Sequence, residues 1–122
     1  MGKDDLARFG EDVAAKYLQH NGYQIVQRNY HSPYGEIDII CKQGGVFVCV
    51  EVKARRSLKF GEPLESVTKK KQERIIKTAY HYLATHESES PIRFDIITLQ
   101  YIPKEKSYKL EHIKNAFMGE LF

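Results

Sequence analysis

The chain has 122 residues, of which 42% are hydrophobic and 29% are charged, and its formal net charge is +3. This composition excludes a disordered chain and predicts one folded domain over residues 1–122. The longest apolar runs are too short to cross a bilayer, and the first residues lack the apolar core of a signal peptide. We therefore expect no membrane association and residence in the cytoplasm.

Apolar spacing predicts a first helix over roughly residues 4–20, ended by Asn21-Gly22. A strand should follow from Tyr23 to about Tyr30, with residues 31–35 connecting it to the next strand. Glu11 lies at the margin of the helix's apolar stripe, where an acidic residue is usually solvated. It could instead reach over the edge of the sheet as an additional carboxylate.

The next two predicted strands carry the most informative residues of the chain. Apolar positions alternate over residues 37–41 and 46–52, and the two glycines at 44–45 suit a two-residue hairpin loop. In that register the numbers of paired residues sum to 89, which places Asp38 opposite Glu51. A slip by one residue would turn both acids onto apolar faces, although a slip by two stays open.

Folding alone gives no reason to place Asp38 opposite Glu51, because like charges on facing residues are destabilising. A divalent cation between them would remove this penalty, and Mg²⁺ or Mn²⁺ prefers such oxygen ligands. Lys53 projects from the same face and could orient or deprotonate an attacking water. Glu36, opposite Lys53 in this register, could assist the metal. The alternative is an exposed hairpin face on which Glu36 and Lys53 form an ordinary ion pair.

A second helix is predicted over about residues 63–86, with Pro63 in its first turn. Lys71 and Gln72 interrupt its apolar stripe and point toward the sheet, where Lys71 either snorkels or contacts a phosphate or the site. Strands over residues 92–99 and 107–113 and a terminal turn at 115–118 complete the chain. The order αβββαβ predicts an α/β fold with a mixed sheet flanked by helices.

Positive charge is concentrated after the candidate site. Between Lys53 and Lys77 nine basic residues stand against three acidic ones, a net charge of +6. A polyanion's backbone could bind there. For Lys69 and Lys70 a solvated helix face is the alternative. The residues expected to bind nucleic acid are Arg55, Arg56, Lys69, Lys71, Gln72 and Arg74.

Several motifs at compatible spacing carry a family resemblance. They include Gly10-Glu11, Gly35-Glu36-Ile37-Asp38, Val50-Glu51-Val52-Lys53, Phe60-Gly61, residues 67–71 and Arg93-Phe94-Asp95. With these residues the chain resembles the UPF0102 (YraN-like) family. That family is similar to the restriction-endonuclease-like PD-(D/E)xK nucleases and, among them, to archaeal Holliday-junction resolvases. The proline that precedes the aspartate in those nucleases is replaced by Ile37.

The resemblance implies a restriction-endonuclease-like fold and a Mg²⁺- or Mn²⁺-dependent DNA endonuclease. Asp38 and Glu51 match the superfamily's metal ligands, Lys53 matches its lysine, and Glu11 is similar in position to a helix glutamate of resolvases. The substrate could be branched or damaged DNA, and kinship with resolvases would suggest a homodimer that makes two cuts.

Two rival functions stay open: a non-catalytic nucleic-acid-binding module on a nuclease-like scaffold, and an assembly protein whose basic helix meets an acidic partner. Divalent metal binding and metal-dependent turnover would separate the enzyme from both rivals.

Overall fold

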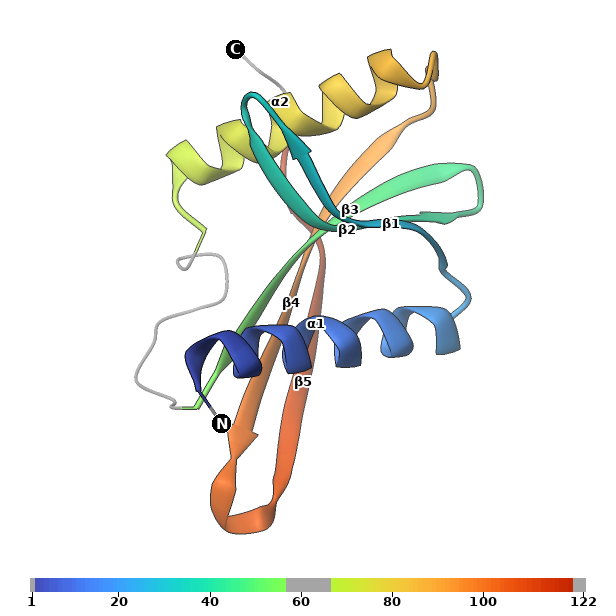
Figure 1. Ribbon diagram of the computed structural model, residues 1–122. Helices are drawn as coiled ribbons and strands as arrows, with labels where there is room; N and C mark the ends of the chain where they lie inside the picture. The colour runs from blue at the N-terminus through green and yellow to red at the C-terminus, as the bar shows by residue number, and fades with distance from the viewer. Residues whose placement is uncertain (1, 57–66, 120–122) are drawn as a thin grey trace.

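The computed structural model describes residues 2–56 and 67–119. They form a five-stranded sheet in the order β1-β2-β3-β4-β5 with two α-helices (Figure 1). The elements in chain order are α1 (Lys3–His20), β1 (Gln24–Ser32), β2 (Gly35–Gln43), β3 (Val46–Arg55), α2 (Lys69–Thr85), β4 (Ile92–Ile102), the short 3₁₀ helix η2 (Pro103–Glu105) and β5 (Ser107–Phe117). None of the helices in these ranges is long and apolar enough to cross a membrane.

The sheet is mixed. β3 and β4 are parallel, and the other three neighbouring pairs are antiparallel. The parallel pair needs a long crossover, which contains α2, whereas tight turns join the antiparallel neighbours. Figure 1 also shows that the β4–β5 hairpin extends beyond α1. The prediction of an α/β fold with a mixed sheet flanked by helices is confirmed.

Each helix packs on its own hydrophobic core, and alternate side chains of the central strands divide between the two. Leu18 and Ala14 of α1 pack with Val50 and Ile97, whereas α2 packs on a second cluster that includes Cys49. Helix α1 approaches β3 closely at Gly10, because a Cβ added to Gly10 would lie 2.6 Å from the Cβ of Ala54. Gly10 therefore allows α1 to lie directly on β3.

In the first half of the chain, the end of β1 and the start of β2 differ from the prediction. β1 continues to Ser32 and pairs it with Gly35, so the connection to β2 has two residues rather than five. The hydroxyl of Ser32 accepts a hydrogen bond from the backbone N–H of Tyr34 at 3.0 Å, which stabilises the shorter turn. α1 ends where expected, with Asn21 as its C-cap.

Three further differences lie in the second half, and the first is that β4 continues to Ile102 rather than ending at residue 99. The expected start of the second helix at residue 63 is wrong because Thr68 is extended and caps α2, accepting a hydrogen bond from the backbone N–H of Lys71. Pro63 itself lies outside the described residues. The expected turn at 115–118 is also wrong, since β5 continues to Phe117, which pairs with Phe94 of β4.

Candidate functional site

The candidate site forms where β2 and β3 separate. Their pairs run from Gln43–Val46 to Ile39–Val50, which confirms the register in which paired numbers sum to 89. Both turn glycines have positive φ, as the tight loop requires. The β2–β3 ladder ends at the Ile39–Val50 pair, and the Asp38 carboxylate accepts a hydrogen bond from the backbone N–H of Val52 at 2.8 Å. A side chain thus replaces a strand-to-strand hydrogen bond.

Asp38 and Glu51 interact at this point, on the sheet face that carries α2. Glu51 is buried, with 7% of its surface exposed. Burial and, next, the nearby charge of Glu51 together raise the pKa of Asp38 to about 7, because they outweigh the hydrogen bond from Val52, which lowers it. The expected proximity of the two acids is therefore present, and it carries an electrostatic cost.

Two lysines contact the same carboxylate oxygen. The Nζ atom of Lys71 lies 3.3 Å from Oε1 of Glu51, and that of Lys53 lies 3.9 Å from it. Burial lowers the pKa of Lys53, and its hydrogen bond with Lys71 lowers it further. For Lys71 burial opposes the charge, but Glu51 and the neighbouring hydrogen bonds outweigh it and raise the pKa. Lys53 thus has the weaker hold on its proton, as a general base requires.

Helix α2 brings Lys71 to the site through its first turn. The Thr68 cap binds the backbone N–H of Lys71 and so fixes where the helix begins. The expectation that Lys71 points toward the sheet is confirmed by its ion pair with Glu51. Gln72 instead donates its side-chain amide to the carbonyl oxygen of Val67 at 3.0 Å, which stabilises the start of the helix.

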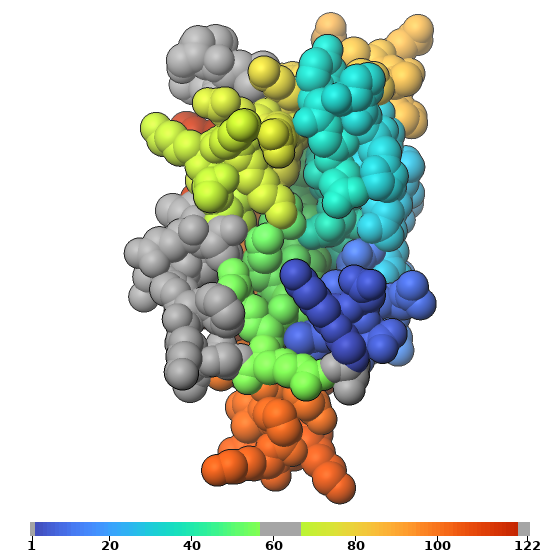
Figure 2. All heavy atoms as spheres, turned by 60° about the vertical axis from the view of Figure 1, so that its left-hand side comes forward, coloured from blue at the N-terminus to red at the C-terminus, as the bar shows by residue number. Residues whose placement is uncertain are grey.

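A groove of about 360 Å³ adjoins the site between α2 and the β1–β2 hairpin. Its lining residues are Gly35, Glu36, Thr68, Lys70, Lys71, Arg74 and Ile75. In Figure 2 the green atoms of β3 are visible between the yellow-green start of α2, the turquoise hairpin and the blue helix α1. A ligand in this groove would meet positive charge from Lys70, Lys71 and Arg74.

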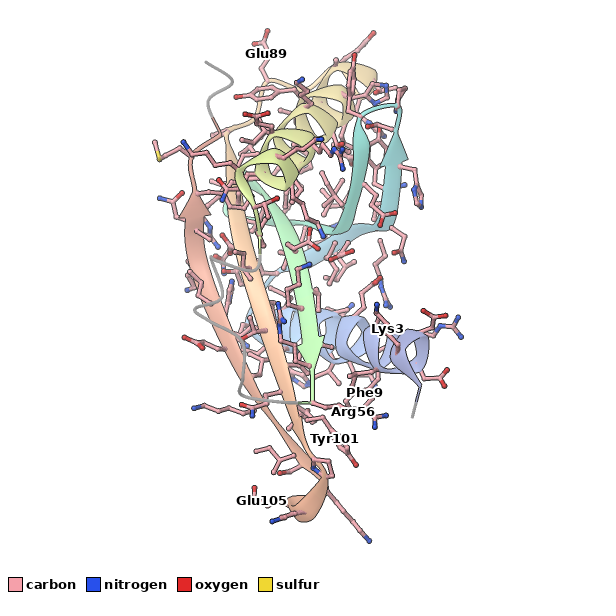
Figure 3. The ribbon with its side chains drawn as sticks, turned by 90° about the vertical axis from the view of Figure 1, so that its left-hand side faces the viewer. Lys3, Phe9, Arg56, Glu89, Tyr101 and Glu105 are labelled. Carbon is pink, nitrogen blue, oxygen red and sulfur yellow. The ribbon has the colours of Figure 1, made fainter. Side chains whose placement is uncertain are left out.

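The remaining expected nucleic-acid contacts lie farther apart. Lys69 is exposed as the first residue of α2. Arg55 is the last residue of β3 and Arg56 follows it. Figure 3 shows Arg56 at the end of the sheet near Phe9, distant from α2. The groove therefore brings together Lys71 and Arg74 but not Arg56.

Glu11 and Glu36 have other partners. Glu11 accepts hydrogen bonds from the side chains of Arg28 at 3.3 Å and Asn29 at 2.8 Å. Burial raises its pKa, and the charge of Asp38 adds to this effect, so Glu11 lies within electrostatic range of the site. Glu36 pairs across the β1–β2 ladder with His31, at 3.2 Å between Nδ1 and Oε2, rather than with Lys53. Within residues 2–56 and 67–119 no three His, Cys, Asp or Glu side chains form a group that could hold a metal ion.

Asp38 and Glu51 nevertheless fit a divalent ion that takes its other ligands from phosphate and water. Mg²⁺ and Mn²⁺ commonly use one or two protein carboxylates in this way. Glu51 is buried and Asp38 is half-buried, and burial and the charge of Glu51 raise the pKa of Asp38, a cost that a bound cation would remove. The donor set is therefore chemically suited to such an ion.

A second polar cluster on the α1 face was missed in the sequence. Asp95 is fully buried, and Arg93 donates to both of its carboxylate oxygens at 2.9 and 2.8 Å. The Nε2 atom of His112 lies 2.7 Å from Oδ2, and the backbone N–H of Asn115 donates to Oδ1 at 3.0 Å. The opposite ring nitrogen of His112 contacts the hydroxyl of Tyr17 at 3.0 Å. These bonds join β4 and β5 to α1.

One signal could have revealed this cluster. Arg93 and Asp95 are two residues apart in an otherwise apolar strand, so they share a face, and buried charges need partners. His112 could not be assigned to them without the β4–β5 register, in which it faces Ile97.

Comparisons with known proteins agree with the resemblance seen in the sequence. A family model described as "Uncharacterised protein family UPF0102" matches residues 10–99. A UPF0102 protein of Thermodesulfovibrio yellowstonii is 43% identical over 117 residues, which covers 96% of this chain and 99% of the relative. One from Chlorobium chlorochromatii is 45% identical over 120 residues, covering 95% and 93%. One from Dictyoglomus turgidum is 40% identical over 118 residues, covering 96% and 100%.

Proposed function

This chain belongs to the UPF0102 family, and we propose that it is a divalent-metal-dependent DNA endonuclease. The observation that carries the proposal is the interaction between the half-buried carboxyl group of Asp38 and the buried one of Glu51, with two lysines on Glu51. A fold gains nothing from placing two acids together at this depth. Perturbed carboxyl groups beside a charged groove are typical of functional sites.

Each residue has a role in this proposal. Asp38 and Glu51 would hold Mg²⁺ or Mn²⁺, which when bound stabilises negative charge on the scissile phosphate. Lys53, whose pKa is lowered by burial, orients the attacking water and takes its proton. Lys70 and Arg74 in the groove bind neighbouring phosphates as fixed positive charges. Glu11, within range of Asp38, stays a predicted additional ligand.

DNA is favoured over a small phosphate ester because the groove runs between the β1–β2 hairpin and the start of α2, where several cations line it. Basic side chains line it on the helix side, and Lys69 adds another exposed cation at the helix start. Branched DNA is the substrate form suggested by kinship with resolvases. Cytoplasmic residence and a homodimer also stay predictions.

A cleavage assay tests the proposal. Linear, flapped and four-way-junction DNA are incubated with Mg²⁺ or Mn²⁺, and wild type is compared with Asp38→Asn and Glu51→Gln. We expect each substitution to reduce cleavage at least about 100-fold, because removal of one metal ligand removes stabilisation of the transition state. Asp12→Asn is the matched control, since Asp12 is an acid of α1 that is bonded to Arg28 at the surface.

The outcomes separate the rivals. Unchanged cleavage by Asp38→Asn would refute the assigned site. Salt-sensitive DNA affinity without any metal-dependent turnover would support the nucleic-acid-binding module instead. If the protein bound neither DNA nor metal, the assembly protein would be the remaining hypothesis.

A further inference from the structure

Glu51 has more partners than one carboxylate needs. Lys71 and Lys53 both approach its Oε1 atom, and the carboxyl group of Asp38 interacts with it from the other strand. The closer lysine is Lys71 from α2, at 3.3 Å, not the strand lysine at 3.9 Å. A positive charge therefore already occupies the carboxylate that the proposed function assigns to a metal ion.

Lys71 is also the lysine that can leave. Its side chain is 42% exposed, compared with 22% for Lys53. It stands in the first turn of α2 and lines the groove with Lys70 and Arg74, so rotation of its flexible stem would carry the ammonium group from Glu51 toward the groove. Lys53 lies within a strand and has no such second position among the groove-lining residues.

A divalent ion on Glu51 and an ammonium group on the same oxygen would repel each other. A phosphate in the groove would attract that ammonium group instead. We propose that Lys71 is a built-in counter-ion, which neutralises Glu51 in the metal-free protein and moves to a nucleic-acid phosphate when substrate binds, so that metal and nucleic acid bind cooperatively. This inference rests on the proposed function. It adds that the two ligands, metal and nucleic acid, each raise the affinity of the protein for the other.

Reciprocity gives the inference a measurable form. If phosphate binding removes Lys71 from Glu51, nucleic acid raises the affinity for metal, and metal raises the affinity for nucleic acid by the same factor. Couplings of this kind are typically about 5- to 150-fold, and we expect about tenfold from one displaced ammonium group.

The first experiment measures Mn²⁺ binding to the DNA-free protein, by electron paramagnetic resonance of the unbound ion. Lys71→Gln should bind Mn²⁺ about tenfold more tightly than wild type, because no ammonium group competes for Glu51. Lys71→Arg keeps the positive charge and should resemble wild type. Lys70→Gln is the matched control, since Lys70 lines the groove and is the helix neighbour of Lys71. Lys71→Ala provides a second neutral variant, and circular dichroism verifies folding.

The second experiment repeats the titration with a short phosphorothioate duplex, with Mn²⁺ binding by the duplex alone subtracted. Wild-type affinity for Mn²⁺ should rise about tenfold, whereas that of Lys71→Gln should stay constant. An equal rise in both proteins would overturn the inference.

The DNA-free titration also separates this inference from the proposed function. Equal Mn²⁺ affinity of wild type and Lys71→Gln, or weaker binding by the variant, overturns the counter-ion and leaves the nuclease proposal standing. Binding by Lys71→Gln but not by wild type supports the counter-ion. No binding by any variant overturns both.

Discussion

Two acidic clusters lie on opposite faces of the sheet, one around the buried Glu51 and one around the buried Asp95. In the parallel ladder Asp95 is opposite Val50, and Glu51 is opposite Ile96, one position along. Asp95 is bonded to Arg93, His112 and a backbone N–H. Although burial opposes its charge, these hydrogen bonds hold the pKa of Asp95 below its usual value. On the other face, burial and Glu51 raise that of Asp38.

The difference distinguishes a structural network from a candidate site. Around Asp95 each buried polar side-chain atom has a hydrogen-bond partner, and the network ties two strands to α1. Around Glu51 the carboxyl groups of two acids interact with each other, and the ammonium groups of two lysines approach the same carboxylate oxygen. The first arrangement stabilises the fold as it stands, whereas the second becomes favourable when a cation is added.

The largest effect on stability should come from the Asp95 cluster. Arg93→Met removes the bidentate partner and leaves a buried carboxylate undercompensated, so we expect the free energy of unfolding to fall by about 3 kcal/mol. Arg28→Met is the control, because Arg28 pairs with acids near the surface and should cost less than about 1 kcal/mol. Urea denaturation measures both, and equal losses would contradict the structural role of Asp95.

An opposite and smaller effect is expected at Asp38. Its raised pKa means that the folded state favours the protonated acid, so wild-type stability falls as pH rises from its ordinary value of 3.8 through about 7. Asp38→Asn avoids this loss and keeps an oxygen for the N–H of Val52. With EDTA present, it should be more stable than wild type by about 1 to 3 kcal/mol at pH 8.

The same comparison at pH 5 provides the internal control. There the folded wild-type carboxyl is largely protonated, so the advantage of Asp38→Asn should shrink. Thermal unfolding at both pH values measures the difference. An advantage of equal size at pH 5 and pH 8 would show that the pKa of Asp38 is not raised in the folded protein.

The smallest effect should come from Glu36, which the sequence offered as a fourth acid. It is exposed and pairs with His31, so Glu36→Gln should change the free energy of unfolding by less than about 0.5 kcal/mol. Mn²⁺ affinity should also stay unchanged. If Glu36→Gln weakened Mn²⁺ binding as strongly as Asp38→Asn, Glu36 would belong to the site after all.

These clusters also show how far the sequence could be interpreted. The β2–β3 register followed from alternation and two turn glycines, so the meeting of Asp38 with Glu51 was predictable. The inward direction of Lys71 followed from helical spacing. The end of the ladder at Ile39 was not predictable, because it depends on the Asp38 side chain taking the N–H of Val52. That exchange also explains why Glu36 never reaches a position opposite Lys53.

The start of α2 and the partners of Asp95 were harder to predict from the sequence, for different reasons. Pro63 is a common first-turn residue, but the hydroxyl of Thr68 determines where α2 begins. His112 reaches Asp95 through a strand pairing whose register shifts between Phe94 and Ile96. A pattern based on regular alternation does not account for such a shift.

The backbone contact at Gly10 has a consequence for the spacing of charges. Gly10 seats α1 on Ala54, one residue from Lys53, and Glu11 is the next residue of the helix. Any side chain larger than hydrogen at Gly10 would push the helix outward and carry Glu11 away from Asp38. The gap between an acid of the helix and the acids of the sheet is thus determined by an uncharged residue, and it can be widened without altering any charged group.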